Sequence, residues 1–384
     1  MTDAETLRQR MVDGLAARGE LDPWWRTAFT EVPRHAFLPD TVWCQNGTSS
    51  GNDLIPMRRA DDPERWLELA YANAPVNTQV DDGNPVGEDG SGFEVTSSAS
   101  MPAVMAQMLT ALDLRPGMRA LEIGTGTGYN AALLAHRLGA DNVVSVEVDP
   151  AVAAQARRAL ADSGYGAVTV VTGNGADGYR DGAPYDRVLA TVAATDVPYP
   201  WVAQTRPGGR VLLPWTSVYH PSGLLTLTVA ADGSATGRIG DPASFMRLRA
   251  QRVPRRRAGG LVADRDTTLA TVSTTEVHPY HVAANRDAAT AIGLRVPNCQ
   301  YTYSPQSSEA GTLWLVDQWS GSWATVDLTA DPPYEVRQGG DRKLWDEVDA
   351  AYRWWLDVGK PAVGVWRFTI TPSGQRVELT EPLV

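Results

Sequence analysis

The sequence predicts an α/β fold, in which a Rossmann-like parallel sheet is followed by a C-terminal α+β domain. Between residues 100 and 215, strand-like and helix-like segments alternate, which is typical of a parallel sheet with helices on both faces. The strand pattern at 119–123 runs into a glycine-rich turn that opens a helix, an arrangement that binds nucleotides. The tail, residues 261–384, differs in kind and carries seven of the 13 tryptophans.

Length and charge limit the classes of function. A chain of 384 residues favours two domains, and a net charge of -11 argues against a nucleic-acid partner. The charged N-terminus does not have the layout of a signal peptide, and no run approaches the roughly 18 apolar residues that cross a bilayer. We therefore expect a cytoplasmic protein without a membrane partner. Cys44 and Cys299 are expected to be reduced core residues.

The first domain is expected to span residues 1–253, with a mainly helical part at 1–95 and a Rossmann core at 96–253. The helices are expected at 4–19, 24–29, 101–113, 129–138, 150–162 and 199–205, and the strands at 119–123, 143–147, 168–172, 186–192, 209–214, 223–229 and 245–253. Residues 82–92 have the composition of a loop, and a breaker-rich basic linker follows at 252–260. The second domain, 261–384, is expected to contain strands in 312–327, a helix at 341–357 and a hairpin near residue 373.

The glycine-rich turn is the best candidate for a cofactor site. Gly124, Gly126 and Gly128 let the backbone approach a ligand, and Thr125 lies between the first two. The helix that starts at Tyr129 offers free amide groups to a carboxylate.

Two later strand ends complete the candidate cofactor site. Glu147 closes the second strand, where an acid can accept both hydroxyls of a ribose. We assign the ribose to Glu147 and the cap of the next helix to Asp149, with the alternative that both acids merely cap. Asn174 and Gly175 follow the third strand, where the asparagine amide can bind a purine edge or simply form a turn.

These features suit either NAD or S-adenosylmethionine. Glu122 stands two residues before the first glycine, and the turn Thr205-Arg-Pro-Gly-Gly-Arg210 precedes a strand. Both features favour S-adenosylmethionine, and no residue is evidently placed to steer a nicotinamide. We expect S-adenosylmethionine as the cofactor and no metal.

Five stretches together resemble the protein-L-isoaspartate O-methyltransferase family over roughly residues 5–253. They are Val32-Pro-Arg-His-Ala-Phe37, the turn at 121–129, Ala183-Pro-Tyr-Asp186, Thr191-Val-Ala-Ala-Thr-Asp-Val-Pro198 and Gln204-Thr-Arg-Pro-Gly-Gly209. Thr96-Ser97-Ser98 matches the family's Thr-x-Ser. The chain departs from the family at 99–102, where the proline is displaced, and at Asn174, which replaces an aspartate.

The resemblance implies methyl transfer to a carboxylate, with Ser98 in contact with the acceptor or the cofactor. Residues 98 and 100 could instead be helix caps. A carboxylate is already ionised at neutral pH, so the reaction needs neither a general base nor a metal. The methyl ester formed on an aspartate can cyclise to an aspartimide, which hydrolyses to aspartate or isoaspartate.

The tail is similar to those of methyltransferases associated with ribosomally made, modified peptides of the lanthipeptide and graspetide-like kinds. This similarity favours a dedicated precursor peptide as the partner. A general isoaspartate-repair enzyme is the main alternative; a non-catalytic peptide-binding module and a small-molecule methyltransferase are further ones. The tail tryptophans can be core residues or a peptide platform.

Three other features have plain structural interpretations beside functional ones. His35 is expected to pack within the fold. His278 and His281 have a short metal-like spacing but no evident further ligands. The basic run at 255–257 can steer an acidic peptide or serve as a solvated linker.

Overall fold

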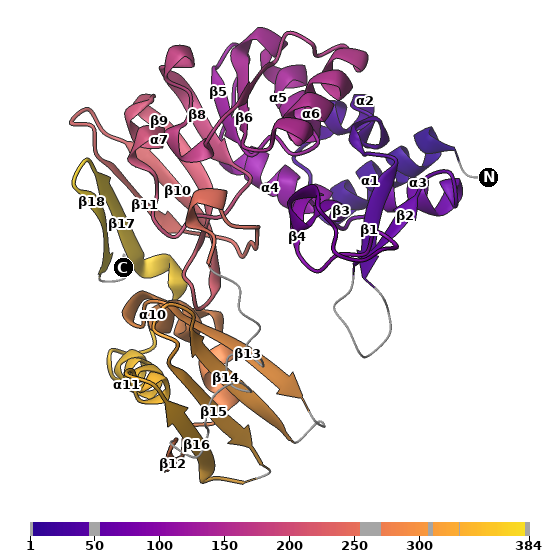
Figure 1. Ribbon diagram of the computed structural model, residues 1–384. Coiled ribbons are helices and arrows are strands. Elements are labelled where there is room, and N and C mark those ends of the chain that lie inside the picture. Colours follow the sequence, from indigo (N-terminus) through magenta and orange to yellow (C-terminus); the bar gives the residue numbers. More distant parts are fainter. Residues whose placement is uncertain (1–2, 46–53, 254–269, 306–309, 330, 381–384) are drawn as a thin grey trace.

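The computed structural model describes residues 3–45, 54–253, 270–305, 310–329 and 331–380. The described chain forms a Rossmann body, an N-terminal body beside it and a tail sheet at its other end (Figure 1). The basic run at 255–257 lies outside the described residues.

A nine-stranded mixed sheet forms the Rossmann body. Its strands are β5 (Ala120–Ile123), β6 (Val143–Glu147), β7 (Thr169–Thr172), β8 (Tyr185–Ala190), β9 (Thr205–Thr216), β10 (Pro221–Val229), β11 (Ala235–Ile239), β17 (Trp366–Thr371) and β18 (Gly374–Leu379). They lie in the order β18-β17-β11-β10-β9-β8-β5-β6-β7. The strands from β9 to β7 pair in parallel, and the others pair antiparallel.

Helices cover both faces of this sheet, as the sequence predicts. They are α4 (Pro102–Ala111), α5 (Tyr129–Leu138), α6 (Pro150–Asp162) and α7 (Tyr199–Ala203). Successive strand residues point to opposite faces, so Leu212 packs in the core of α4 and α5 while Val211 packs in the core of α7. The predictions 143–147, 129–138 and 150–162 match β6, α5 and α6 to the residue, because each element has clear start and stop signals.

The N-terminal body contains a four-stranded sheet beside its helices, and the prediction of a helical part at 1–95 did not include this sheet. It holds α1 (Ala4–Ala17), α2 (Pro23–Glu31) and α3 (Pro63–Tyr71) together with β1 (Thr41–Gln45), β2 (Leu54–Arg58), β3 (Val76–Val80) and β4 (Val95–Ala99). These strands form an antiparallel sheet in the order β2-β1-β3-β4. Each strand has five residues without strict alternation of burial, so the sequence gives a weak periodic signal.

The tail contains a sheet of its own. Its elements are β12 (Thr271–Thr275), α9 (Pro279–Ala283), α10 (Arg286–Arg295), β13 (Cys299–Pro305), β14 (Gly311–Asp317), β15 (Trp323–Leu328), β16 (Tyr334–Gly339) and α11 (Leu344–Asp357). The five strands are antiparallel in the order β12-β16-β15-β14-β13, and Leu313 and Leu315 share a core with α10 and α11.

The end of the tail returns to the Rossmann body. Strand β17 pairs with β11, and Phe368 on β17 packs in the same core as Leu121 of β5 (Figure 1). The sequence assigns residues 261–384 to one separate domain, whereas the sheets divide before β17. Removing the whole tail would strip two strands from the Rossmann sheet.

Most tail tryptophans serve as core. Trp323, Trp345, Trp355 and Trp366 are buried, while Trp319 is 51% exposed. A platform of exposed tryptophans therefore does not form in the described tail.

The remaining sequence candidates have structural settings. His35 bonds through Nδ1 to the hydroxyl of Tyr71 at 2.6 Å. Among the described residues no group of three His, Cys, Asp or Glu could hold a metal ion, and Cys44 and Cys299 are unbridged. None of the described helices is long and apolar enough to span a membrane.

Candidate active site

A cavity of about 990 Å³ opens at the carboxyl ends of β5, β6, β7 and β8. Ligands bind at this edge of open α/β sheets. Seven of the eight predicted site residues line the cavity: Ser98, Gly124, Thr125, Gly126, Glu147, Asn174 and Gly175. Gly128 is not among the lining residues. It caps α5 with a φ of +89°, and a Cβ there would lie 3.4 Å from the Ala156 side chain.

The glycine turn is left open toward the cavity by its backbone. Gly124 has a φ of +94°, and a Cβ there would approach the hydroxyl oxygen of Thr191 to 2.7 Å. Gly126 has a φ of +53°, and the nearest atom to its Cβ would be the carbonyl oxygen of Ser98 at 3.7 Å. A side chain at Gly126 would therefore occupy space between the turn and β4, where a ligand has to enter.

Glu147 and Asp149 have different tasks. Glu147 accepts hydrogen bonds from the Gly126 N–H through Oε2 at 2.9 Å and from the Asp149 N–H through Oε1 at 3.1 Å. Asp149 caps α6 through Oδ1 and accepts the Gln79 amide through Oδ2 at 2.9 Å. Each Glu147 oxygen accepts one hydrogen bond, whereas Asp149 accepts three and lies 3.9 Å from the Arg249 guanidinium. We therefore still expect Glu147, with more acceptor capacity left, to bind the ribose hydroxyls.

A buried polar network supports the turn from below. Glu122 is fully buried and accepts hydrogen bonds from Asn130 at 2.6 Å and from Ser145 at 2.5 Å. Burial raises the pKa of Glu122 to about 7, although both hydrogen bonds lower it. The Thr125 hydroxyl joins this network through Ser145 at 2.6 Å. The side chain of Thr125 thus fixes the turn, and its backbone is the part that faces a ligand.

The Asn174-Gly175 turn is held locally. The side-chain oxygen of Asn174 accepts the Ala176 N–H at 3.1 Å, so only its amide nitrogen remains as a donor toward a purine. A Cβ on Gly175 would lie 2.7 Å from Ile123, and the Gly175 carbonyl accepts the Trp201 indole N–H at 2.8 Å. Glycine is therefore required at 175 by packing.

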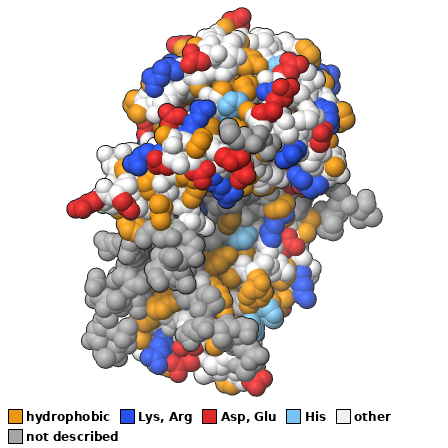
Figure 2. All heavy atoms as spheres, turned by 90° about the vertical axis from the view of Figure 1, so that its right-hand side faces the viewer, with side chains coloured by type: hydrophobic (Ala, Val, Ile, Leu, Met, Phe, Trp, Pro, Cys, Tyr) orange, Lys and Arg blue, Asp and Glu red, His pale blue; other side chains and the backbone are white. Residues whose placement is uncertain are grey.

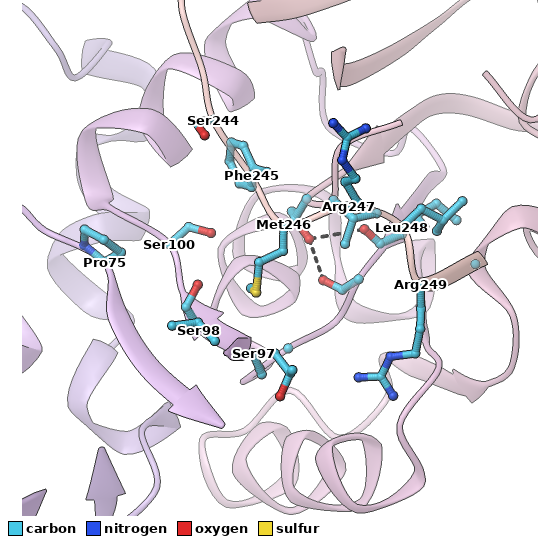
Figure 3. Close-up of a pocket in the computed structure, with 18 of the residues that line it drawn as sticks. Pro75, Ser97, Ser98, Ser100, Ser244, Phe245, Met246, Arg247, Leu248 and Arg249 are labelled. Atoms are coloured by element: carbon cyan, nitrogen blue, oxygen red, sulfur yellow. Dashed lines mark hydrogen bonds between the residues drawn. The ribbon is translucent and has the colours of Figure 1, made fainter. Parts of the chain in front are cut away.

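Ser98 lies on β4 and not at the mouth of a helix, which corrects its predicted placement. Its Cα is paired with that of Asn77 on β3. The residue that precedes α4 is Met101, and the Ala103 N–H is instead bound by the side chain of Asn73 at 3.0 Å. The helix-cap interpretation is therefore wrong for residue 98. Ser98 and Ser100 lie on the cavity wall opposite Met246 (Figure 3).

Arg34, within the motif at 32–37, holds this wall in place. Its fully buried guanidinium donates to the carbonyls of Ala70, Ala72, Ala74, Ala99 and Ser100 at 2.7 to 3.4 Å. Burial lowers the pKa of Arg34 to about 10. This one side chain ties the end of α3 to the segment that carries Ser98, so Arg34 is a positioning residue.

An extended segment, residues 242–249, crosses the cavity and is called the strap (Figure 3). The predicted strand at 245–253 is wrong, because only one bridge forms, between Ala193 and Arg247, before a 3-10 turn at Arg249–Gln251. Met246 accepts the Ala193 N–H at 2.7 Å, and the Leu248 N–H donates to the Ala193 carbonyl at 2.8 Å.

Ion pairs from the end of the strap and from the residues just after it connect this segment to the N-terminal body. Arg252 donates both terminal nitrogens to Asp82 at 2.6 and 3.0 Å, and Arg249 reaches the same carboxylate at 3.0 Å. The hydrogen bonds from Arg252 lower the pKa of Asp82. These contacts close the cavity beside Asp149.

The opposite end of the cavity is built by the tail and by the turn between β9 and β10. His220 of that turn, Arg286 of α10 and Gln300 of β13 line it, together with Arg247 of the strap. Sequence reasoning missed all four residues, as it missed Arg34, Gln79, Asp82 and Arg252. The two closely spaced arginines of Arg247-Leu-Arg249 were an available signal of positive charge in this segment.

The cofactor end fits the shape and chemistry of S-adenosylmethionine. Gly126 leaves open the space that a Cβ would fill, and Glu147 faces it as a hydroxyl acceptor. On the opposite wall, the polar residues Thr96, Ser97 and Ser98 of β4 line the cavity. The arrangement can align a bound methyl donor with an acceptor that enters between β4 and the strap.

Comparison with known proteins gives a consistent family. Residues 59–247 match the family model described as protein-L-isoaspartate(D-aspartate) O-methyltransferase. A protein-L-isoaspartate O-methyltransferase of Hyperthermus butylicus is 30% identical over 251 residues, which are 63% of this chain and 88% of that protein. A protein-L-isoaspartate O-methyltransferase 2 of Anaeromyxobacter is 33% identical over 256 residues, which are 66% and 85% of the two chains.

A solved structure supports the fold over almost the whole chain. A structure named protein-L-isoaspartate O-methyltransferase aligns with 97% of this chain and 100% of its own, with a TM-score of 0.54 and 20% identity. The alignment extends into the tail.

Proposed function

Because the chain belongs to the protein-L-isoaspartate O-methyltransferase family and is an S-adenosylmethionine-dependent methyltransferase, we propose that it methylates an aspartyl or isoaspartyl carboxylate of a peptide. The observation that carries the proposal is the continuity of one cavity. The same cavity is lined by Gly126 and Glu147 at one end and by Ser98 and Ser100 on the facing wall.

The residues of the chain act mainly by alignment. S-adenosylmethionine, when bound, supplies an electrophilic methyl group. Glu147 accepts ribose hydroxyls, the Asn174 amide donates to the purine, and Ser98 donates a hydrogen bond that orients the acceptor carboxylate. That carboxylate is ionised at neutral pH, so no base has to remove a proton from it. Holding the reacting atoms in line then provides most of the rate enhancement.

Methylation prepares the carboxylate for a second step that needs no further group from the enzyme. The next backbone amide nitrogen attacks the ester carbonyl, the bond to the methoxy oxygen breaks, and the amide proton leaves with it as methanol. The product is a five-membered succinimide. Water then opens this ring to aspartate or isoaspartate.

We further propose that the substrate is one dedicated peptide. General repair of isoaspartyl proteins is the alternative. The specific observation in favour of a dedicated peptide is that Arg286 and Gln300, both from the tail, line the cavity. The tail thus contributes directly to the wall that would contact residues beside the acceptor. A general repair enzyme has to accept many sequences, whereas a wall of this kind can discriminate among them.

A peptide panel separates the two. Purified protein and S-adenosylmethionine are incubated with isoaspartyl peptides of unrelated flanking sequence and with their aspartyl counterparts, and esters and succinimides are measured by mass spectrometry. Similar kcat/KM values across the isoaspartyl set, with no reaction of the aspartyl set, would establish repair. Strong dependence on flanking sequence, with succinimide formed from an aspartyl peptide, supports the dedicated role. No ester on any peptide would refute the proposed function.

A further inference from the structure

In the described chain, acidic side chains and unpaired arginines lie at different ends of the cavity. The acidic residues that line it are Glu94, Glu122, Glu147 and Asp149, which lie on or beside β4, β5 and β6. Arg249 and Arg252 lie near them and are paired with Asp82. The other two arginines of the lining, Arg247 and Arg286, lie at the far end, where no acidic residue of the described chain lines the wall.

Arg247 is a cation without a carboxylate partner in the part of the chain that the structure describes. Its terminal nitrogens donate to the Thr195 hydroxyl at 2.8 Å and to the Ser217 carbonyl at 2.6 Å. Burial lowers the pKa of Arg247. It projects from the strap in the direction opposite to Arg249, away from the cofactor end (Figure 3).

Arg286 forms hydrogen bonds on the other side of the turn between β9 and β10. Its Nε donates to the Ser222 carbonyl at 2.6 Å and one terminal nitrogen donates to the Gly240 carbonyl at 2.5 Å. Asp287 and Asp241 raise the pKa of Arg286, but burial lowers it more, and neither carboxylate forms an ion pair with it among the described residues. The two guanidinium groups thus flank the turn that carries His220 between β9 and β10.

Uncompensated guanidinium groups beside a cavity are suited to a carboxylate, because their N–H donors match its two oxygens. Donors remain on both arginines, since the carbonyls they bind use only part of the fork. We propose that Arg247 and Arg286 bind a second carboxylate of the peptide substrate, distinct from the one that is methylated, so that acidic peptides are preferred. This inference rests on the proposed function, since it assigns the substrate class of that site.

The arrangement also explains how an acidic protein can take an acidic peptide. The net charge of -11 repels such a substrate at long range. Local positive charge at the far end of the cavity offsets this repulsion where contact is made. The second carboxylate can belong to an aspartate or glutamate near the acceptor or to the end of a short peptide, and the test separates these sources.

The test uses matched isoaspartyl peptides. One set carries Glu or Gln at each of the two positions on either side of the acceptor, and each peptide is made with a free or an amidated C-terminus. For the wild type we expect kcat/KM to be about tenfold higher for the best acidic peptide than for its neutral match, mostly through KM. A preference that follows Glu identifies a side chain as the source, and one that follows the free C-terminus identifies the chain end.

Variants then assign the preference to the two arginines. Arg247→Gln and Arg286→Gln should each bring the acidic-to-neutral ratio of kcat/KM toward one, whatever their effect on the rate with the neutral peptide. Arg247→Lys should keep part of the ratio because it keeps the charge. Arg353→Gln is the control, because the Arg353 side chain is exposed on the outer face of α11 and paired with Asp349 at 2.7 Å; it should keep the wild-type ratio.

The acidic-to-neutral ratio of kcat/KM distinguishes substrate binding by the two arginines from a merely structural role. General destabilisation would lower the rates on the acidic and the neutral peptide alike. A wild-type ratio of one, or an unchanged ratio in both glutamine variants, overturns the inference. Fluorescence anisotropy with fluorescently labelled forms of these peptides measures their binding in the absence of methyl transfer. Preferential binding of the acidic peptide without any methylation would refute the proposed function and leave the subsite standing.

Discussion

The two ends of the cavity are built in different ways. The cofactor end comes from short stretches, each at the end of a parallel strand, and its key bonds join residues 2 to 23 positions apart. The far end assembles the strap, the β9–β10 turn, α10 and β13, and the bond from Arg286 to Ser222 spans 64 positions. The family match at residues 59–247 includes Arg247 but stops short of Arg286 and Gln300. We therefore assign cofactor binding and the proposed substrate preference to different parts of one cavity.

The largest effect should come from filling the open space at the glycine turn. We expect Gly126→Val to weaken S-adenosylmethionine binding by at least about 100-fold, because the new side chain occupies the ligand space and the φ of +53° is unfavourable for valine. Isothermal titration calorimetry measures this. Gly164→Val is the matched control, since Gly164 has a φ of +85° with no atom within 4 Å of its Cβ. It should show similar strain and normal binding; near-native affinity in Gly126→Val would remove the assignment of this site.

A smaller loss at the same end is expected from Glu147. Glu147→Ala should weaken the cofactor by about 1.5–3 kcal/mol, the range for hydrogen bonds to a charged group. It should also loosen the turn, since the Gly126 N–H loses its acceptor. Asp149→Ala should instead lower stability by about 1 kcal/mol through the lost helix cap. If the two variants exchange these effects, Asp149 is the ribose acceptor.

A variant of Ser98 tests the cavity wall that β4 forms between the two ends. We expect Ser98→Ala to lower kcat by up to about tenfold, the equivalent of one neutral hydrogen bond, while cofactor affinity changes little. Ser273→Ala on β12 is the control, because the Ser273 side chain is exposed and lies outside the cavity lining. Equal rates for wild type and Ser98→Ala would leave Ser98 without a part in catalysis.

The smallest effect on function is expected at Glu122, beneath the turn. Its pKa rises from 4.5 to about 7 on folding, so the folded state favours the neutral carboxyl. The resulting stabilisation is complete below about pH 4.5 and is lost as the pH rises to about 7. Glu122→Gln should flatten the dependence of the melting temperature on pH across this window. An unchanged slope would mean that Glu122 is ionised in the folded protein throughout.

The sequence predicted the cofactor end well because its signals are local. The strand ends at Glu147 and Ile123 and the helix starts at Tyr129 and Pro150 are each marked by neighbouring residues. For the same reason the sequence already assigned the ribose to Glu147 and the helix cap to Asp149, since the capping bonds are local. The bond from Gln79 to Asp149 spans 70 positions and is visible only in the structure.

The rest depended on contacts between distant segments. Ser98 was recognised from its motif, but its position on β4 is fixed by pairing with β3 and by Arg34. The return of β17 to the Rossmann sheet is likewise a pairing between residues more than 100 positions apart, with Ala235 facing Ile370. Neither composition nor periodicity predicts which strands will pair.

One measurement tests the central claim most directly, namely that S-adenosylmethionine at the cofactor end delivers its methyl group to a peptide carboxylate held between β4 and the strap. An isoaspartyl peptide and its otherwise identical carboxamide analogue are incubated with the protein and S-adenosylmethionine, and the methylated position is mapped by mass spectrometry. We predict a base-labile methyl ester on the carboxylate of the first peptide and no transfer to the second. Methylation of the amide analogue, or no transfer to either peptide by protein that binds the cofactor, would contradict the account.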